Sequence, residues 1–283
     1  LKSNSEQRRE GVDVTMRWSD TTPRKFTYEV GFNMTYFNSL WKVKADEALS
    51  DLMNPYKRQT HQTDYYGLGY IDTGLYQNKE DILNSPRRLG STQTKLGDIG
   101  YTDVNGDGKI DGEDQVRIGK PTMPHFTYAF DFSLGYEGFT LSGLLYGTGE
   151  RYMTFGNRYQ SGEGKYLYYE NQLNYWRPDN TGADFPRISI SSGVNGNNNK
   201  AGSTFWMRNA SYLRLKDLQL SYDFKYKYLK KCDWLQTCRV NLSGSNLFTI
   251  SGVSKFFDPE TSSTSGDGYP VQRVYSIGVT IGF

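Results

Sequence analysis

The sequence predicts an all-β protein, built from the antiparallel strands of a transmembrane β-barrel. Apolar and polar residues alternate in blocks of about ten residues, which is the pattern of strands with one lipid-facing side. No stretch approaches the ~18–20 consecutive apolar residues of a membrane-spanning helix, so strands would have to make any membrane crossing. The 23 Tyr, 15 Phe, 5 Trp and 30 Gly residues, in a chain of mean hydropathy −0.70, suit many half-buried strands.

The first two strands form a predicted hairpin. Apolar residues occupy every second position from Val12 to Trp18, and after the turn TTPRK the same alternation resumes from Phe26 to Tyr36. Two alternating segments separated by a short polar turn predict an antiparallel pair.

Five further strands follow the same pattern. They are predicted at 126–134, from 139 onward, at 212–224, at 239–248 and at 271–283. The apolar phase shifts near Asp217, which predicts a β-bulge there. The sequence therefore predicts seven strands.

The connections between these strands alternate in length. Short connections are expected near 20–24, 135–138 and 225–236, and long ones near 39–122, 149–205 and 250–268. Outer-membrane barrels have short periplasmic turns and long extracellular loops. If the last strand ends in the periplasm, every short connection falls there and every long one falls outside.

A soluble β-sandwich is the alternative to a barrel, because its strands alternate too. The predicted strands are long, and aromatic residues lie near their ends, as in the girdles at membrane interfaces. These residues are Trp18, Tyr36, Tyr222 and Phe224. Both features favour the barrel.

The two ends of the chain carry different signals. A terminal Phe preceded by apolar residues at every second position resembles the signal by which bacterial outer-membrane barrels are recognised for insertion. The residues concerned are Tyr275, Ile277, Val279, Ile281 and Phe283. The N-terminal segment LKSNSEQRREGVDV has no apolar signal-peptide core, so we expect the chain to begin within a longer polypeptide.

Five motifs in this order resemble the C-terminal third of the SusC/RagA family of TonB-dependent outer-membrane transporters of Bacteroidetes. They are GDIGYTDVNGDGKIDGEDQVRIGKP, NYWRPDNTGADFPRI, WMRNASYLRLKDLQLSY, RVNLSGSNLFTI and the closing DPE, YP and IGF elements. Together they cover roughly residues 65–283.

This resemblance implies a barrel of 22 strands closed by an N-terminal plug, of which residues 1–283 form the C-terminal part without the plug. It further implies import of oligosaccharides across the bacterial outer membrane, with peptides as the alternative substrate. The implied partners are a SusD-like surface lipoprotein, TonB acting through the missing N-terminal part, and outer-membrane lipid. From the residues alone, a secreted calcium-stabilised β-sandwich that binds glycans, or a structural surface protein, stays open.

The segment DVNGDGKIDGED, residues 103–114, has the spacing of an EF-hand calcium loop. Calcium prefers six to eight oxygen ligands, and Gly108 at the sixth position permits the sharp turn that gathers them. The candidate ligands are Asp103, Asn105, Asp107, the carbonyl of Lys109, Asp111 and Asp114. The sequence therefore predicts a Ca2+ site, with a solvated acidic turn as the alternative.

Aromatic residues crowd the two longest connections, where their rings could stack on sugar faces or pack against one another. These candidate ligand contacts are Tyr65, Tyr66, Tyr70, Tyr76, Tyr159, Tyr166, Tyr168, Tyr169, Tyr175 and Trp176.

Other chemistry is not indicated. His61 and His125 are the only histidines, and neither lies in an HExxH motif, nor does a Ser lie in GxSxG, so no catalytic site is predicted. With 33 Lys and Arg against 31 Asp and Glu, scattered along the chain, no nucleic-acid partner is expected. Cys232 and Cys238 are either two unrelated thiols or a disulfide across a small loop.

Overall fold

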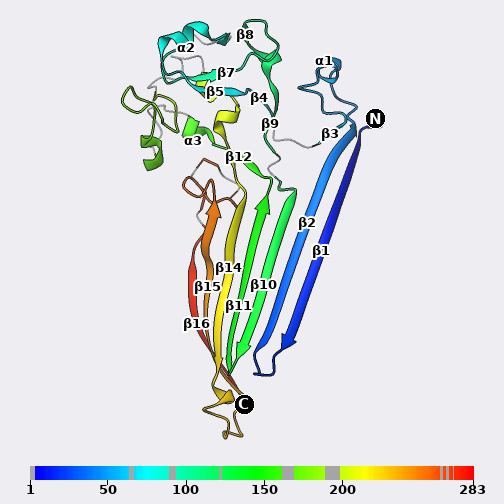
Figure 1. Ribbon diagram of the computed structural model, residues 1–283, viewed down its shortest axis with the longest axis vertical. Helices are drawn as coiled ribbons and strands as arrows, with labels where there is room; N and C mark the ends of the chain where they lie inside the picture. The colour runs from blue at the N-terminus through cyan, green and yellow to red at the C-terminus, as the bar shows by residue number, and fades with distance from the viewer. Residues whose placement is uncertain are drawn as a thin grey trace.

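The computed structural model is a long antiparallel sheet with a loop-rich body at one end (Figure 1). It describes residues 4–63, 67–88, 94–120, 123–160, 169–188, 198–261, 264–265, 268–269 and 271–283. Among these residues, no helix has the length and apolar character needed to cross a bilayer.

Seven long strands form the sheet in their order along the chain, each antiparallel to the next. They are β1 (Glu6–Thr21), β2 (Thr27–Val43), β10 (Phe126–Tyr136), β11 (Phe139–Gly149), β14 (Tyr212–Asp223), β15 (Thr237–Ser251) and β16 (Val274–Gly282). A short strand, β3 (Gln62–Thr63), pairs with the end of β2. The prediction of seven strands is confirmed.

The first hairpin is longer than its apolar alternation. β1 begins at Glu6 and not at Val12, because the polar residues 6–11 continue to pair with β2. Backbone pairing needs no apolar side chain, and Lys42 Nζ lies 2.5 Å from Glu6 Oε1 in this extension.

The register places the apolar residues of all seven strands on one face. Phe130 faces Phe32 on β2 and Leu145 on β11. At the other side of the sheet, Leu242 faces Ile277. Both remain exposed, at 54% for Leu242 and 76% for Ile277, because no second sheet covers this face in the described part of the chain. A sandwich would bury it, so the exposed face agrees with a lipid-facing barrel wall.

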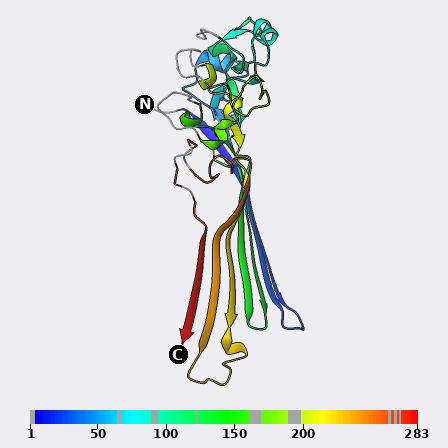
Figure 2. The ribbon, with the colours of Figure 1, turned by 90° about the vertical axis from the view of Figure 1, so that its left-hand side faces the viewer.

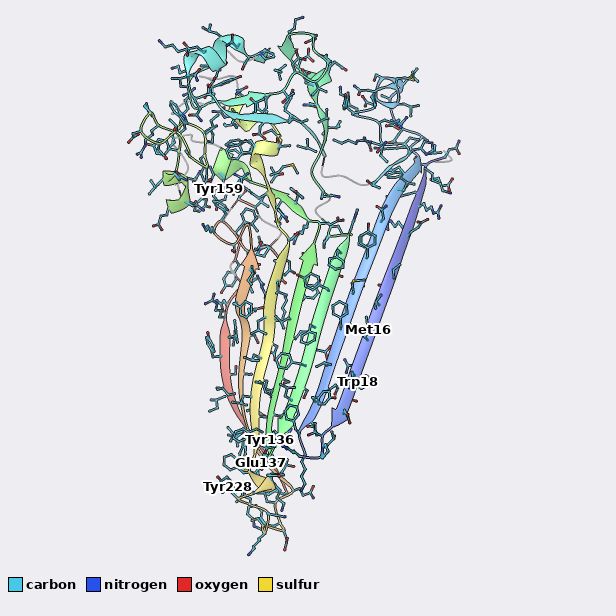
Figure 3. All side chains as sticks on the ribbon, in the orientation of Figure 1. Met16, Trp18, Tyr136, Glu137, Tyr159 and Tyr228 are labelled. Atoms are coloured by element: carbon cyan, nitrogen blue, oxygen red, sulfur yellow. The ribbon has the colours of Figure 1, made fainter. Side chains whose placement is uncertain are left out.

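Aromatic residues gather where the strands end. Trp18 and Tyr136 lie toward the short-turn end of the sheet (Figure 3). There the rings of Phe139 and Tyr222 lie 4.4 Å apart, and the ring of Phe224 lies 5.0 Å from that of Tyr222. This arrangement is typical of an aromatic girdle.

A bulge interrupts β14 at the predicted place. Leu144 of β11 pairs with Asp217 and Leu145 pairs with Leu215, which leaves Lys216 as an extra residue. The pairing with β15 shifts at the same point. The bulge lets Lys216 share the polar face with Arg214, and both contact Glu260 there.

Short and long connections lie at opposite ends of the sheet, as predicted (Figures 1 and 2). The short ones span 22–26, 137–138 and 224–236, and the long ones span 44–125, 150–211 and 252–273. Glu137 and Gly138 form a tight turn in which both residues have positive φ, of 48° and 86°. Cys232 and Cys238, at this short-turn end, are free thiols.

The long connections contain only short elements. In 44–125 these are α1 (Leu49–Met53), β4 (Gly67–Gly69), β5 (Asp72–Leu75), α2 (Lys79–Asn84), β6 (Arg87–Arg88), β7 (Ile99–Tyr101), β8 (Lys109–Ile110), η1 (Gly112–Asp114) and β9 (Val116–Ile118). In 150–211 they are β12 (Tyr152–Thr154), α3 (Asn157–Gln160), η2 (Glu170–Leu173), η4 (Asn198–Lys200), η5 (Thr204–Trp206) and β13 (Met207–Asn209).

All three long connections share one hydrophobic core, which we call the loop core. Its buried members are Tyr70, Ile99, Tyr101, Ile110, Met153, Phe155, Tyr159, Phe185, Trp206, Ala210, Val253 and Phe257. Phe155 lies at its centre, with ring centroids 4.9 Å from Tyr159 and 5.9 Å from Phe257. The loops therefore fold as one body.

Candidate functional site

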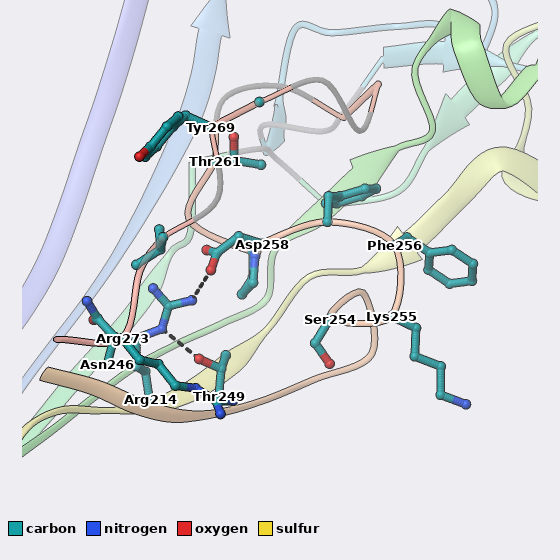
Figure 4. Close-up of a pocket in the computed structure, with 14 residues that line it drawn as sticks. Arg214, Asn246, Thr249, Ser254, Lys255, Phe256, Asp258, Thr261, Tyr269 and Arg273 are labelled. Atoms are coloured by element: carbon teal, nitrogen blue, oxygen red, sulfur yellow. Dashed lines mark hydrogen bonds and ion pairs between the residues drawn. The ribbon is translucent and has the colours of Figure 1, made fainter. Parts of the chain in front are cut away.

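The polar face of the sheet meets the loop body at a buried arginine. The side chain of Arg214, on β14, is only 1% exposed. Its guanidinium lies 2.5 Å from Asp258 Oδ2 and 2.9 Å from Glu260 Oε2. It also donates to Thr249 Oγ1 at 2.7 Å. The two ion pairs tie the 252–273 connection to the sheet wall, and Thr249 of β15 holds the guanidinium in place. We call these contacts the tether, and Figure 4 shows those to Asp258 and Thr249.

Glu260 has two further partners in the tether. Lys216 Nζ lies 2.7 Å from Glu260 Oε2, and the Tyr212 hydroxyl donates to Glu260 Oε1 at 2.7 Å. Burial opposes ionisation of Glu260, but these hydrogen bonds and the charge of Arg214 outweigh burial and lower its pKa. Two cations thus balance two carboxylates.

A cavity of about 430 Å³ lies beside the tether, on the polar face. Arg273 and Tyr269 line one part of it, and Lys255 and Phe256 lie on the other side (Figure 4). Asn246 contributes an amide, which donates to the carbonyl of Gln272 at 3.2 Å. The cavity combines cationic, aromatic and neutral polar groups, as ligand sites do.

Most of the described aromatic residues that the sequence offered as ligand contacts are buried instead. Tyr70, Tyr76, Tyr159 and Trp176 are each only 4–8% exposed. The Tyr159 hydroxyl donates to the carbonyl of Phe256 at 2.9 Å. The burial favours the alternative in which these rings pack against one another.

The remaining aromatic residues that were predicted as ligand contacts are either partly buried or outside the described residues. Tyr169 and Tyr175 are partly buried against the loop core. Tyr65, Tyr66, Tyr166 and Tyr168 lie outside the described residues. The cavity residues Lys255, Tyr269 and Arg273 were missed by the sequence interpretation. The DPE and YP elements, which lie between Lys255 and Arg273 and include Tyr269, were the available signal, because they mark a connection with its own pattern.

The acidic loop 103–114 is closed by hydrogen bonds from its own backbone. The carboxylate of Asp103 accepts from Gly106 N at 2.6 Å and from Gly108 N at 2.7 Å. Desolvation raises the pKa of Asp103, but the hydrogen bonds from these amides outweigh it, and the pKa is lowered. Asp114 is fully buried, and its carboxylate accepts from Val104 N and Asp111 N, both at 2.8 Å.

The other predicted calcium ligands form turns within this loop. Asn105 Oδ1 accepts from Asp107 N at 3.0 Å, and Asp107 Oδ1 accepts from Lys109 N at 2.9 Å. Asp111 Oδ1 accepts from Glu113 N at 2.8 Å. In the part of the chain that the structure describes, no three acidic, His or Cys side chains are grouped to hold a metal ion. The calcium site stays a prediction.

The proposed assembly signal forms the last strand of the sheet. Tyr275, Ile277, Val279 and Ile281 lie on the apolar face and are 52–76% exposed. Phe283 stacks on Trp234 of the 224–236 connection, with ring centroids 5.8 Å apart and planes 12° apart. The recognition role of this strand stays a prediction.

Comparison with known proteins agrees with this geometry. No family model matches the chain. TonB-dependent receptor P3 of Formosa agariphila is 25% identical over 307 residues, which cover all of this chain and 29% of that protein. TonB-dependent receptor P26 of the same organism is 26% identical over 228 residues, covering 74% of this chain and 22% of that protein. The chain is similar to TonB-dependent receptors, as its motifs indicated.

Solved structures show the same fold. "Structure of the RagAB peptide transporter" matches with a TM-score of 0.68 and 19% identity, over 98% of this chain and 29% of that one. The same importer in the "closed-closed" state matches with a TM-score of 0.68 and 20% identity. The fold prediction of an antiparallel barrel wall is confirmed, whereas the count of 22 strands stays a prediction.

Three further points follow for this chain. It spans under a third of the relatives that it matches, at 29% and 22% of their lengths. The similarity and the exposed apolar face place it in the bacterial outer membrane. The relatives are receptors and transporters and not enzymes, so no catalytic role is assigned.

Proposed function

We propose that this chain forms part of the wall of a TonB-dependent transporter that imports oligosaccharides across the outer membrane. The observation that carries the proposal is the division of the sheet into two faces. One face is a continuous apolar surface, and the other is polar and holds a cavity at the end where the long connections lie. A barrel that conducts hydrophilic molecules through lipid needs this division.

The partners belong to the same proposal. A SusD-like surface lipoprotein covers the extracellular mouth and contacts the loop body, and TonB acts through the plug. The matching structures are those of a peptide transporter, so peptide import is the second candidate. The cavity's mixture of aromatic rings, hydroxyls and an amide supports the oligosaccharide, because sugars offer both apolar faces and hydroxyl groups.

The acidic loop 103–114 is proposed as a calcium site that stiffens the loop body. Its spacing supports this role, and extracellular calcium in the millimolar range would fill even a weak site of this kind.

Uptake by cells tests the transport proposal. Strains that carry or lack the full-length transporter are given fluorescently labelled oligosaccharides and, separately, labelled peptides of similar mass. We expect the oligosaccharide to accumulate only when both the transporter and TonB are present. Accumulation of peptides alone would show that peptides, and not oligosaccharides, are the substrate. Uptake that continues without TonB would contradict TonB-dependent transport.

A further inference from the structure

We infer that the cavity beside the tether binds an anionic group, a carboxylate or a sulfate, of the oligosaccharide that the proposed function assigns to this transporter. The inference therefore rests on that function and adds a charge class to its substrate. Arg273 is the residue that holds the anion, and Lys255 lies on the other side of the cavity with its side chain extending away from Arg273, so that it adds only weaker, longer-range positive potential.

The charge of the cavity is the first argument. In the tether, Arg214 and Lys216 balance Asp258 and Glu260, so these four side chains together carry no net charge. Arg273 and Lys255 then remain, and neither has an ion-pair partner among the described residues. The described lining is thus left with two uncompensated positive charges.

The accessibility of these cations is the second argument. Arg214 is buried and occupied by its carboxylate partners, so it cannot take a ligand without breaking the tether. Arg273 and Lys255 are exposed. A guanidinium can bind a carboxylate or a sulfate through two parallel hydrogen bonds, which are stronger than neutral ones.

The neighbouring groups fit a sugar. Tyr269 is 81% exposed at the cavity, and its ring can lie against the apolar face of a pyranose ring. Asn246, Thr249 and Ser254 supply amide and hydroxyl groups beside it. A cavity of about 430 Å³ is within the usual range of about 300–1,000 Å³ for small-ligand sites.

The test uses the full-length transporter with its surface lipoprotein, purified in detergent at low ionic strength. Calorimetry measures binding of a galacturonate oligosaccharide, a sulfated oligosaccharide, a neutral oligosaccharide of equal length and an oligoglutamate peptide. The variants are Arg273→Gln and Lys255→Gln. Arg239→Gln is the matched control, because Arg239 is also on the polar face, near the short-turn end, and its side chain is 48% exposed.

We expect Arg273→Gln to weaken binding of the galacturonate or the sulfated oligosaccharide by about tenfold or more, with a smaller loss for Lys255→Gln. Binding of the neutral oligosaccharide should be unchanged, and Arg239→Gln should behave as wild type. Equal affinity of Arg273→Gln and wild type for both anionic oligosaccharides overturns the inference.

The outcomes for the two proposals differ. If wild-type cells import oligosaccharides of any charge but Arg273→Gln changes no affinity, only the inference fails. If wild type imports no oligosaccharide, the proposed function fails. If only the oligoglutamate peptide binds and Arg273→Gln weakens that binding, the cavity binds anions, but its ligand is a peptide. This outcome overturns the inference that the anion belongs to an oligosaccharide.

Discussion

Arg17 on β1 and Asp131 on β10 form an ion pair of 3.3 Å, although β2 runs between their strands. The residue of β2 that pairs with both is Gly31. A Cβ atom at residue 31 would lie 2.4 Å from Asp131 Oδ1. The missing side chain therefore lets the two charges meet across a strand on the polar face.

Replacing this glycine should disturb the contact. We expect Gly31→Val to destabilise the folded protein by ~0.2–1 kcal/mol, because Asp131 must move away from Arg17 and this exposed ion pair is lost. Urea titration of the full-length protein, refolded into lipid vesicles, measures the change. Gly278→Ala is the control, since a Cβ there meets no described atom within 4 Å. Equal stability of Gly31→Val and wild type would contradict the steric argument.

The two faces of the sheet should tolerate charge differently. Phe130→Arg on the apolar face should cost ~2–4 kcal/mol if the residue lies near the bilayer midplane. Thr127→Arg on the polar face of the same strand should cost much less. Folding into lipid vesicles compares the two variants. Equal tolerance at both sites would remove the barrel interpretation.

Breaking the tether should free the 252–273 connection. Arg214→Met leaves the carboxylates of Asp258 and Glu260 without their buried partner, at a cost of about 3 kcal/mol. Limited proteolysis should then cut this connection faster than in wild type, while the sheet stays intact. Arg239→Met removes an exposed arginine and should leave the cleavage rate unchanged. Unchanged cleavage in Arg214→Met would show that the tether does not hold the connection.

The tether should also weaken in acid. The folded pKa of Glu260 lies below its ordinary value of 4.5, so its ionised form stabilises the folded state. This contribution is fully present above about pH 4.5 and is lost as the pH falls through the lowered pKa. The protection of amides in residues 252–261, taken as their exchange relative to the intrinsic rate at each pH, should therefore fall below pH 4.5 in wild type. Glu260→Gln should show no such fall, and an equal fall in both proteins would mean that other groups cause the effect.

Calcium should stabilise the acidic loop if the metal site exists. Asp107→Ala should lower the calcium content and speed proteolysis within residues 103–114 without destabilising the sheet. Metal analysis and proteolysis, with and without chelator, compare the variant with wild type. If wild type holds no calcium and the chelator does not change the rate of cleavage, the loop is a solvated acidic turn and the calcium proposal fails.

The strands could be predicted from sequence because a barrel wall is encoded locally. Alternation with a period of two assigned the face of Phe32 and Phe130, and the break in that alternation near Asp217 located the bulge. The unequal lengths of the connections then predicted which end of the sheet carries the short turns and which carries the long loops. The polar start of β1 and the end of β2 beyond Tyr36 were missed, because the apolar alternation does not continue through residues 6–11 and 37–43 although their backbones pair.

The loop body could not be predicted in the same way. Tyr159 and Phe256 are 97 residues apart, and no local period links them. An aromatic residue in a loop has the same sequence signal whether it binds a ligand or fills a core. The role of Arg273 and Lys255 could not be read from the DPE and YP motifs either, because it depends on which other cations the carboxylates of the tether neutralise.

The shared loop core has a consequence for how such transporters diversify. Phe155 contributes from one connection, Tyr101 from another and Phe257 from the third, so each loop completes the interior of the others. A hydrogen bond also links two of these connections: the Thr204 hydroxyl donates to the carboxylate of Asp72, 132 residues away in the sequence. A loop borrowed alone from a relative would bring side chains that do not match this interior. The three loops are therefore expected to be inherited and exchanged together, as a single cassette.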